Sequence, residues 1–127
     1  MPQQNFYIPQ WRMWNWKLIS PVFVSLQLSR SRQSYRETEN ALAQLDDDVS
    51  KIEQEIRGVW ASANVQMMRG FEYRLKEVGK ERKRINFVRV KLREAIDAML
   101  QHFPEMEKLN DPELRATFGQ EYRNPSA

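Results

Sequence analysis

An unbroken seam of apolar residues runs through the middle of the sequence in alternating steps of three and four positions. Its seven members are Leu42, Leu45, Val49, Ile52, Ile56, Val59 and Ala63. This period predicts an α-helix that presents one continuous apolar stripe to a second helix, as in a coiled coil. An amphipathic helix inside a self-contained bundle has the same spacing, so the seam alone leaves both interpretations open.

A second seam with heptad spacing follows farther along the chain. Its members are Phe71, Leu75, Val78, Ile85, Leu92, Ile96, Met99 and Phe103. Arg82 and Arg89 interrupt it, and we expect these two side chains to pair with acidic groups of a partner. The two seams are out of register, because extending the first frame from Ala63 places core positions at Gln66 and Gly70.

The change of register admits two all-α architectures for residues 31–103. One is a single long coiled-coil-type helix with a local stutter, and the other is an antiparallel helical hairpin. This region contains no proline and is rich in residues that favour helices. No stretch rich in Gly, Pro, Asn and Asp marks a turn, which argues against the hairpin. Residues 1–30 are expected to form an irregular aromatic arm, and residues 104–127 a mostly irregular tail.

The distribution of charge favours the hairpin. Residues 37–56 carry seven acidic side chains against one lysine, whereas residues 69–93 carry ten basic side chains against three glutamates. An acidic helix beside a basic helix is electrostatically complementary when the two run antiparallel. Residues 1–36 carry five basic side chains and no acidic one.

The ends of the helical region are predicted from capping signals. Ser31 or Ser34 is expected to cap the start, and Ser34 with Glu37 matches the capping box. Pro104 is expected to stop the helix, because proline lacks an amide donor and clashes with the preceding turn. Within the tail, Pro112–Phe118 is compatible with a short helical turn.

The aromatic arm holds candidate anchoring residues, which are Trp11, Trp14, Trp16 and Phe23. The apolar stretch in residues 11–28 is divided by Pro21 and is shorter than the ~20 residues that span a bilayer. Three interpretations stay open. The arm packs into a groove of a larger assembly, or it lies on a membrane surface, where tryptophan and cationic side chains are favoured. The third is a mitochondrial targeting segment, since residues 1–36 contain arginine and serine but no acidic residue.

A basic run holds candidate phosphate contacts, which are Lys80, Lys83, Arg84, Arg89 and Lys91. Such a cluster neutralises phosphates, and the nearby Tyr73 and Phe87 offer rings on which bases stack. The alternative is a charged helix face that meets solvent or a protein partner.

The residues of a catalytic or metal site are not apparent. The sequence has no cysteine and one histidine, and it lacks a glycine-rich phosphate loop. The run Asp46-Asp47-Asp48 does not predict a metal site, because consecutive helical side chains point about 100° apart. We therefore expect no enzymatic activity, no cofactor, no metal and no small-molecule substrate.

In layout, residues 31–103 resemble small helical subunits of multi-protein assemblies, such as tethering complexes, organelle-biogenesis complexes and accessory subunits of mitochondrial machines. The resemblance implies an interaction subunit that docks on helical protein partners of a hetero-oligomer through its seams and its arm. Two alternatives remain, a basic accessory protein of a ribonucleoprotein that uses residues 80–93 and a peripheral membrane adaptor that uses residues 11–28. The protein is expected to be intracellular, either mitochondrial or cytoplasmic.

Overall fold

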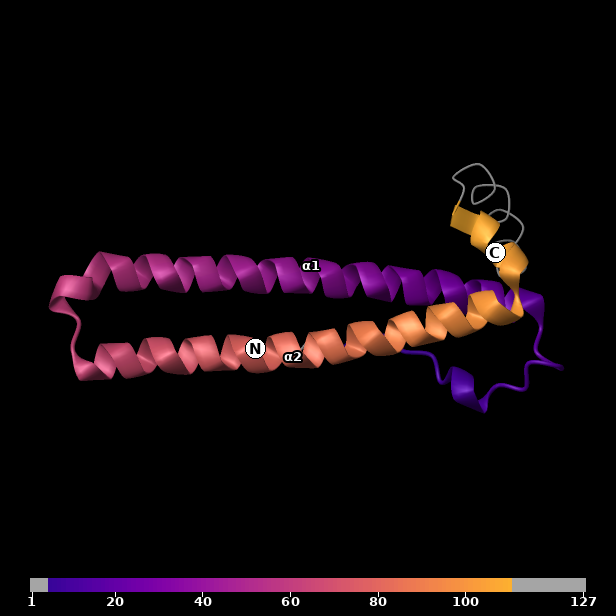
Figure 1. The fold of residues 1–127 in the computed structure, drawn as a ribbon, viewed down its shortest axis with the longest axis horizontal. Coiled ribbons are helices and arrows are strands. Elements are labelled where there is room, and N and C mark those ends of the chain that lie inside the picture. The colour runs from indigo at the N-terminus through magenta and orange to yellow at the C-terminus, as the bar shows by residue number, and fades with distance from the viewer. Residues whose placement is uncertain (1–4, 111–127) are drawn as a thin grey trace, which may run out of the picture.

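Two long antiparallel helices dominate the computed structural model, which describes residues 5–110 (Figure 1). Helix α1 spans Pro21–Val59 and helix α2 spans Val65–His102. The described residues also form three short 3-10 helices, η1 at Trp11–Met13, η2 at Trp60–Ser62 and η3 at Pro104–Asn110. The all-α prediction is confirmed, and of the two predicted architectures the protein adopts the antiparallel hairpin.

The turn of the hairpin is built without glycine or proline. Helix η2 follows α1 directly, and the Ser62 hydroxyl donates a hydrogen bond to the Val59 carbonyl over 3.3 Å. Asn64 then caps α2, since its Oδ1 accepts a hydrogen bond from the Met67 amide over 2.9 Å. An asparagine cap satisfies an amide that the first helical turn leaves unpaired. The change of register between the two seams is therefore a true break in the helix.

Helix α1 begins ten residues before the predicted start, so the assignment of residues 21–30 to an irregular arm is wrong. Ser20 is the N-cap, and its hydroxyl accepts a hydrogen bond from the Val22 amide over 3.2 Å. Pro21 occupies the first helical position, where its missing amide is harmless and its fixed φ angle suits a helix. Ser34, predicted as a cap, lies in the interior of α1 instead.

The seam of α1 extends back to the start of the helix with the same alternation of steps. The added members are Val24, Leu28, Ser31, Tyr35 and Thr38. Ser31 donates a hydrogen bond to the Gln27 carbonyl over 2.7 Å, and Thr38 donates to the Tyr35 carbonyl over 2.5 Å. These local bonds to the helix backbone allow both hydroxyls to be fully buried. Because Ser31 and Thr38 are polar, the apolar pattern of the sequence does not reveal this part of the seam.

Ser34 provides a test of this buried polar face. Its side chain is 2% exposed, and its hydroxyl has no hydrogen-bond partner within the described residues. We expect Ser34→Ala to raise the free energy of unfolding by about 1 kcal/mol, since an unsatisfied buried hydroxyl is removed. Urea denaturation followed by circular dichroism measures the change.

Ser31→Ala is the matched control, because it brings the same gain in helix propensity but removes an existing hydrogen bond. We expect it to stabilise the protein less than Ser34→Ala does. Equal effects of the two substitutions would contradict the assignment of Ser34 as the unsatisfied group.

The N-terminal arm, residues 5–20, runs along α2 in the same direction as that helix (Figure 1). Its course is marked by Arg12 beside Glu94 at 3.6 Å and, farther along, by Trp16 stacked on His102. The arm thus ends at the end of the hairpin opposite the turn, where α1 starts and α2 ends. We call this end the base. There it covers both the start of α1 and the end of α2.

A three-element core fills the base. Its buried members are Val24, Leu28, Ala95, Met99 and Met106, which come from α1, α2 and η3. Partly buried side chains from the arm and from the end of α2 surround them, namely Trp11, Trp14, Trp16, Ile19, Ile96, Leu100 and Phe103. Packing from several sides excludes water from the apolar seam at this end of the molecule.

The end of α2 agrees with the sequence in one respect and differs in another. The helix ends at His102, before Pro104, as predicted. Pro104 then starts η3, which places Met106 in the core of the base, whereas the prediction had an irregular tail from this residue. The predicted helical turn at Pro112–Phe118 lies outside the described residues.

Candidate functional site

The two predicted seams face each other along the hairpin, but they are not covered equally. We call residues 42–59 of α1 and 65–82 of α2 the distal half. Of the predicted partner-binding residues there, Ile52 and Phe71 are buried. The others are half-buried, namely Leu42, Leu45, Val49, Ile56, Val59, Leu75 and Val78, and so is Ala63 in the turn. Two helices alone cover one side of each seam and leave its flanks accessible.

Toward the base, the same seam is sealed. Ile85, Leu92 and Met99 are buried there, and Ile96 is half-buried against the core. The difference arises because the arm and η3 add a third layer at the base. Within residues 5–110, the arm and η3 do not reach the distal half (Figure 1).

An open groove lies between α1 and α2 in the distal half. Its cavity volume is about 590 Å³, and its lining residues are Asp48, Lys51, Ile52, Glu55, Tyr73, Arg74, Glu77 and Val78. Ile52 and Val78 are its aliphatic members, whereas the rest carry charged side chains or the tyrosine ring. We call this feature the distal groove. An apolar floor between charged rims is the surface that an amphipathic helix recognises.

Ion pairs across the hairpin fix its register. Glu55 of α1 pairs with Arg74 of α2, and Asp46 pairs with Arg82. Arg89 donates a hydrogen bond from Nε to the Tyr35 hydroxyl over 3.1 Å. Arg82 and Arg89, the two residues that interrupt the second seam, thus find partners within this chain, although we expected them to meet acids of a second protein.

The pair between Glu55 and Arg74 is exposed to solvent. The hydrogen bond from Arg74 lowers the pKa of the Glu55 carboxyl below its ordinary value, and the charge of Arg74 acts in the same direction. A lowered pKa means that the stabilisation is present at neutral pH and is lost as the pH falls through that pKa. Solvent and salt screen such a pair, so its role is to set register more than to add stability.

Two of the predicted phosphate-contacting residues, Arg84 and Arg89, contact other side chains of this chain. Arg84 pairs with Glu81 on the same helix, and its guanidinium lies 5.9 Å from the Phe6 ring centroid. Arg89 is bonded to Tyr35 of α1. Burial of α2 against α1 and the arm thus removes both side chains from the outer basic face.

The other three predicted phosphate-contacting residues lie nearer to solvent. Lys80 forms an exposed ion pair with Glu77 over 3.3 Å, and Lys91 forms one with Glu94 over 3.6 Å. Lys83 is exposed and makes no ion pair within residues 5–110. The structure therefore divides the predicted basic cluster into half-buried arginines that contact groups of this chain and lysines nearer to solvent.

The tryptophans of the arm are half-buried against the base. Trp14 packs edge to face with Trp16 at 5.4 Å and with Phe23 at 5.3 Å between ring centroids. Trp16 also stacks on His102, with centroids 4.0 Å apart and planes 4° apart. The groove that receives the arm is thus formed by the hairpin of this same chain, and Trp11 packs there too.

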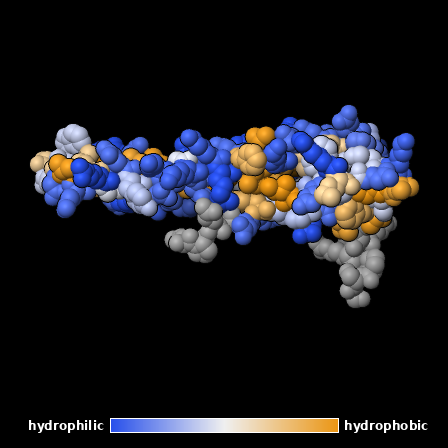
Figure 2. All heavy atoms as spheres, turned by 90° about the horizontal axis from the view of Figure 1, so that it is seen from below, coloured by the Kyte–Doolittle hydropathy of each residue, from blue (hydrophilic) through white to orange (hydrophobic). Residues whose placement is uncertain are grey.

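Apolar side chains remain exposed around the start of α1. They are Met13, Leu18, Val22, Phe23 and Leu26. Figure 2 shows that hydrophobic side chains gather on one face over the half of the molecule that holds the base, whereas the distal half is mostly hydrophilic. No helix within residues 5–110 is both long and apolar enough to cross a membrane.

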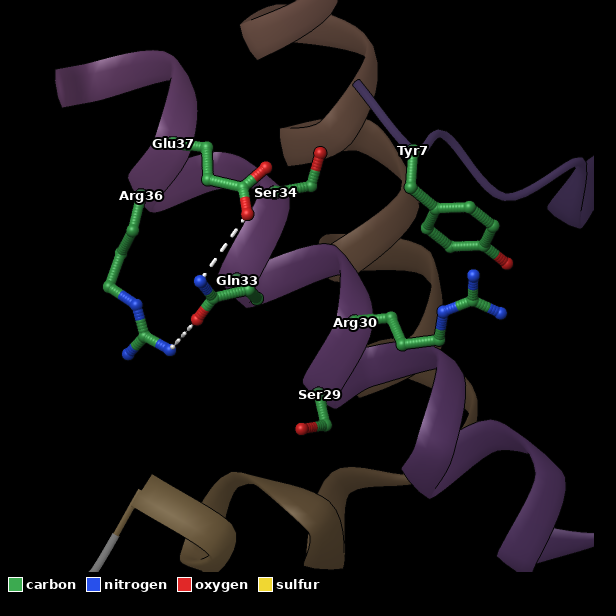
Figure 3. Close-up of a pocket in the computed structure, with 7 residues that line it drawn as sticks. All are labelled: Tyr7, Ser29, Arg30, Gln33, Ser34, Arg36 and Glu37. Carbon is green, nitrogen blue, oxygen red and sulfur yellow. Dashed lines mark hydrogen bonds between the residues drawn. The ribbon is translucent and has the colours of Figure 1, made fainter. Parts of the chain in front are cut away.

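A shallow hollow beside the arm does not assemble a polar site. The residues that line it are Tyr7, Ser29, Arg30, Gln33, Ser34, Arg36 and Glu37. The Arg30 guanidinium lies 4.0 Å from the Tyr7 ring centroid, and Gln33 bonds both Arg36 and Glu37 (Figure 3). Arg36 and Ser29 point away from Tyr7, so the lining side chains do not converge on one point.

Acidic side chains are likewise dispersed. Asp46 pairs with Arg82, whereas Asp48 accepts a hydrogen bond from Gln44 over 3.2 Å on the same helix. Within the part of the chain that the structure describes, no three histidine, aspartate or glutamate side chains come together as metal ligands would.

Comparison of the chain with protein-family models, curated proteins and solved structures finds no match.

Proposed function

We propose that this protein is a non-enzymatic interaction subunit whose distal half binds a helix of a partner protein. The supporting observation is the contrast in burial along one continuous seam. Where the arm covers the seam, Leu28, Leu92 and Met99 are fully buried. Where nothing within residues 5–110 covers it, most seam side chains stay half-exposed. A partner helix in the distal groove would supply the missing third layer.

The energetic reason is the burial of apolar surface. Removing apolar area from water contributes about 25 cal/mol per Å², and a third helix covers the flanks of both seams at once. An amphipathic helix that presents residues at i, i+3, i+4 and i+7 fits a groove between two helices. Ile52 and Val78 are the aliphatic contacts that the distal groove offers to such residues.

Charge indicates which kind of helix binds best. Residues 37–56 of α1 carry seven acidic side chains, and of these Asp46 and Glu55 are neutralised by arginines of α2. The segment of α1 around the distal groove therefore keeps an excess of negative charge, although within the groove lining itself Lys51 offsets Asp48. We propose that the partner helix has an apolar stripe flanked by basic residues on the side that meets α1.

The shape of the molecule suits this role. A helix of 39 residues is about 58 Å long at a rise of ~1.5 Å per residue. The compact base thus carries a narrow two-helix extension that presents its groove far from the arm. Such an extension holds a bound partner at a distance from whatever contacts the base.

A pair of substitutions in the distal groove tests the proposal. The partner is first identified by co-purification of the full chain with mass spectrometry, and binding is then measured with both purified proteins. We expect Val78→Ser combined with Asp48→Lys to weaken binding by at least about tenfold, or ~1.4 kcal/mol. The first change removes an apolar contact, and the second reverses the charge of Asp48 in the groove lining.

The matched control is Val90→Ser combined with Asp47→Lys, which makes the same chemical changes at exposed positions outside the groove. Its affinity should equal that of the unmodified chain. Circular dichroism confirms that both variants keep their helical content. Equal affinities of the groove variant and the control, or hydrogen-exchange protection by the partner outside 42–59 and 65–82, would contradict the proposal.

A further inference from the structure

The outer side of α2 carries a stripe of exposed basic and aromatic side chains, which extends the predicted contacts at Lys80, Lys83, Tyr73 and Phe87 to Arg69 and Lys76. Its members are Arg69, Tyr73, Lys76, Lys80, Lys83 and Phe87, and all six are exposed. They follow one another in steps of four and three positions, so they form a single line along the helix. We call this line the basic stripe, and it is about 27 Å long at ~1.5 Å per residue.

The positive charge of the basic stripe is not neutralised by the hairpin. Arg69, Lys76 and Lys83 form no ion pair within residues 5–110, and Lys80 has an exposed pair with Glu77. Arginines on the inner side of α2 bind α1, as Arg74 does with Glu55. The antiparallel fold thus sorts the bases of α2 into an inner set that pairs and an outer set that faces solvent.

Two aromatic rings lie at intervals in the same line. Tyr73 is 65% exposed and Phe87 is 62% exposed, so both side chains are largely accessible to a ligand. They are 14 residues apart, or about 21 Å along the helix, with three lysines between them. The Lys91 ammonium lies 5.4 Å from the Phe87 ring centroid, which adds one more cation beside that ring.

We propose that the basic stripe binds single-stranded nucleic acid. Lysine and arginine side chains neutralise phosphates, and exposed rings stack on unpaired bases irrespective of sequence. A duplex keeps its bases stacked on each other, so Tyr73 and Phe87 would gain nothing from it. A membrane surface fits less well, because the stretch between the two rings holds lysines where an interfacial helix would present apolar side chains.

The chemistry of the stripe sets the expected specificity. Phosphates and base faces are common to RNA and DNA, and nothing in the stripe is suited to a particular base edge. We therefore expect oligo(U) and oligo(dT) of 20 nucleotides to bind with equal affinity, and a duplex of the same length to bind at least about tenfold more weakly. With four contacting cations, the logarithm of affinity should fall with the logarithm of salt with a slope of about −3.

Fluorescence anisotropy with labelled oligo(U) and the full chain measures the contribution of the lysines. The combination of Lys76→Glu, Lys80→Glu and Lys83→Glu is expected to weaken binding by at least about 100-fold at low salt. The matched control replaces three exposed bases of α1 by glutamate, at Arg36, Lys51 and Arg57, and changes the net charge equally. The control should lose less than tenfold.

A second variant separates stacking from charge. Tyr73→Ala combined with Phe87→Ala should weaken binding by about tenfold and leave the salt slope unchanged, because the cations remain. Both rings are exposed, so neither substitution is expected to disturb the fold, and circular dichroism checks this.

Three outcomes overturn the inference. One is an equal loss of affinity in the lysine variant and its control, which would indicate non-specific attraction. Another is a preference for duplex. The third is binding to vesicles of anionic lipid, lost in the lysine variant, without binding to oligo(U). Tyr73 also lines the distal groove, so the lysine variant separates the two roles, because none of its three positions lines that groove. It should weaken oligo(U) binding and keep the affinity for the helical partner.

Discussion

Replacing Leu92 with alanine is expected to lower the free energy of unfolding by about 2–5 kcal/mol. Leu92 is fully buried in the seam toward the base, where the arm and α1 both contact α2. Deleting its isobutyl group removes apolar contacts and leaves a cavity that packing from several sides prevents from collapsing. Urea denaturation followed by circular dichroism at 222 nm gives the free energy directly.

Leu75 is the matched control, because it occupies the same seam in the distal half but is half-buried. Leu75→Ala should cost clearly less than Leu92→Ala, since part of the side chain already contacts water and the flanks of the seam are open. A cost at Leu75 equal to that at Leu92 would show that the distal seam is as well covered as the base.

Replacing Trp16 with alanine is expected to destabilise the base by about 2–3 kcal/mol, below the range for a fully buried tryptophan because Trp16 is half-buried. Its ring stacks on His102, packs against Trp14 and lies 6.2 Å from the Phe103 centroid. The substitution should detach the arm. Hydrogen exchange should then speed up at the end of α2 and stay unchanged in residues 42–59.

Trp60→Ala provides the control for the loss of an indole ring. Trp60 lies in the turn and is 69% exposed, so its replacement should change stability by no more than about 0.5 kcal/mol. If the two tryptophan variants were equally stable, the arm would contribute nothing to the base. Faster exchange throughout the hairpin in Trp16→Ala would instead show that the base and the distal half unfold as one unit.

Local pattern was sufficient to predict helical structure over residues 31–103, but not where the helices begin and break or all of their core. The seam from Leu42 was visible because every member is apolar, whereas its continuation through Ser31 and Thr38 was not. A hydroxyl that bonds the preceding helical turn can occupy a core position, and hydropathy alone does not reveal this. For the same reason Ser34 resembled a cap, although α1 had already begun at Pro21.

The candidate surfaces were predicted in part. Of the residues that line the distal groove, Ile52 and Val78 belong to the predicted seams, whereas the sequence did not predict the charged side chains around them. The composition of residues 80–93 showed that a basic cluster lies there. It did not show which of its side chains contact this chain and which face solvent. Arg89 bonds α1 and Arg84 lies beside Phe6 of the arm, whereas Lys80 and Lys83 face solvent, because the position of α1 and the arm decides which side of α2 is covered.

The sequence by itself determined the two seams and the helical state of the segments that carry them, and complementary charge favoured antiparallel pairing while a single continuous helix stayed open. These properties depend on neighbours three and four positions apart or on the charge of whole segments, and both can be read along the chain. The tertiary structure alone decided which surfaces remain free. The contact of Trp16 with His102 joins residues far apart in sequence, and it seals the base while the distal groove stays open.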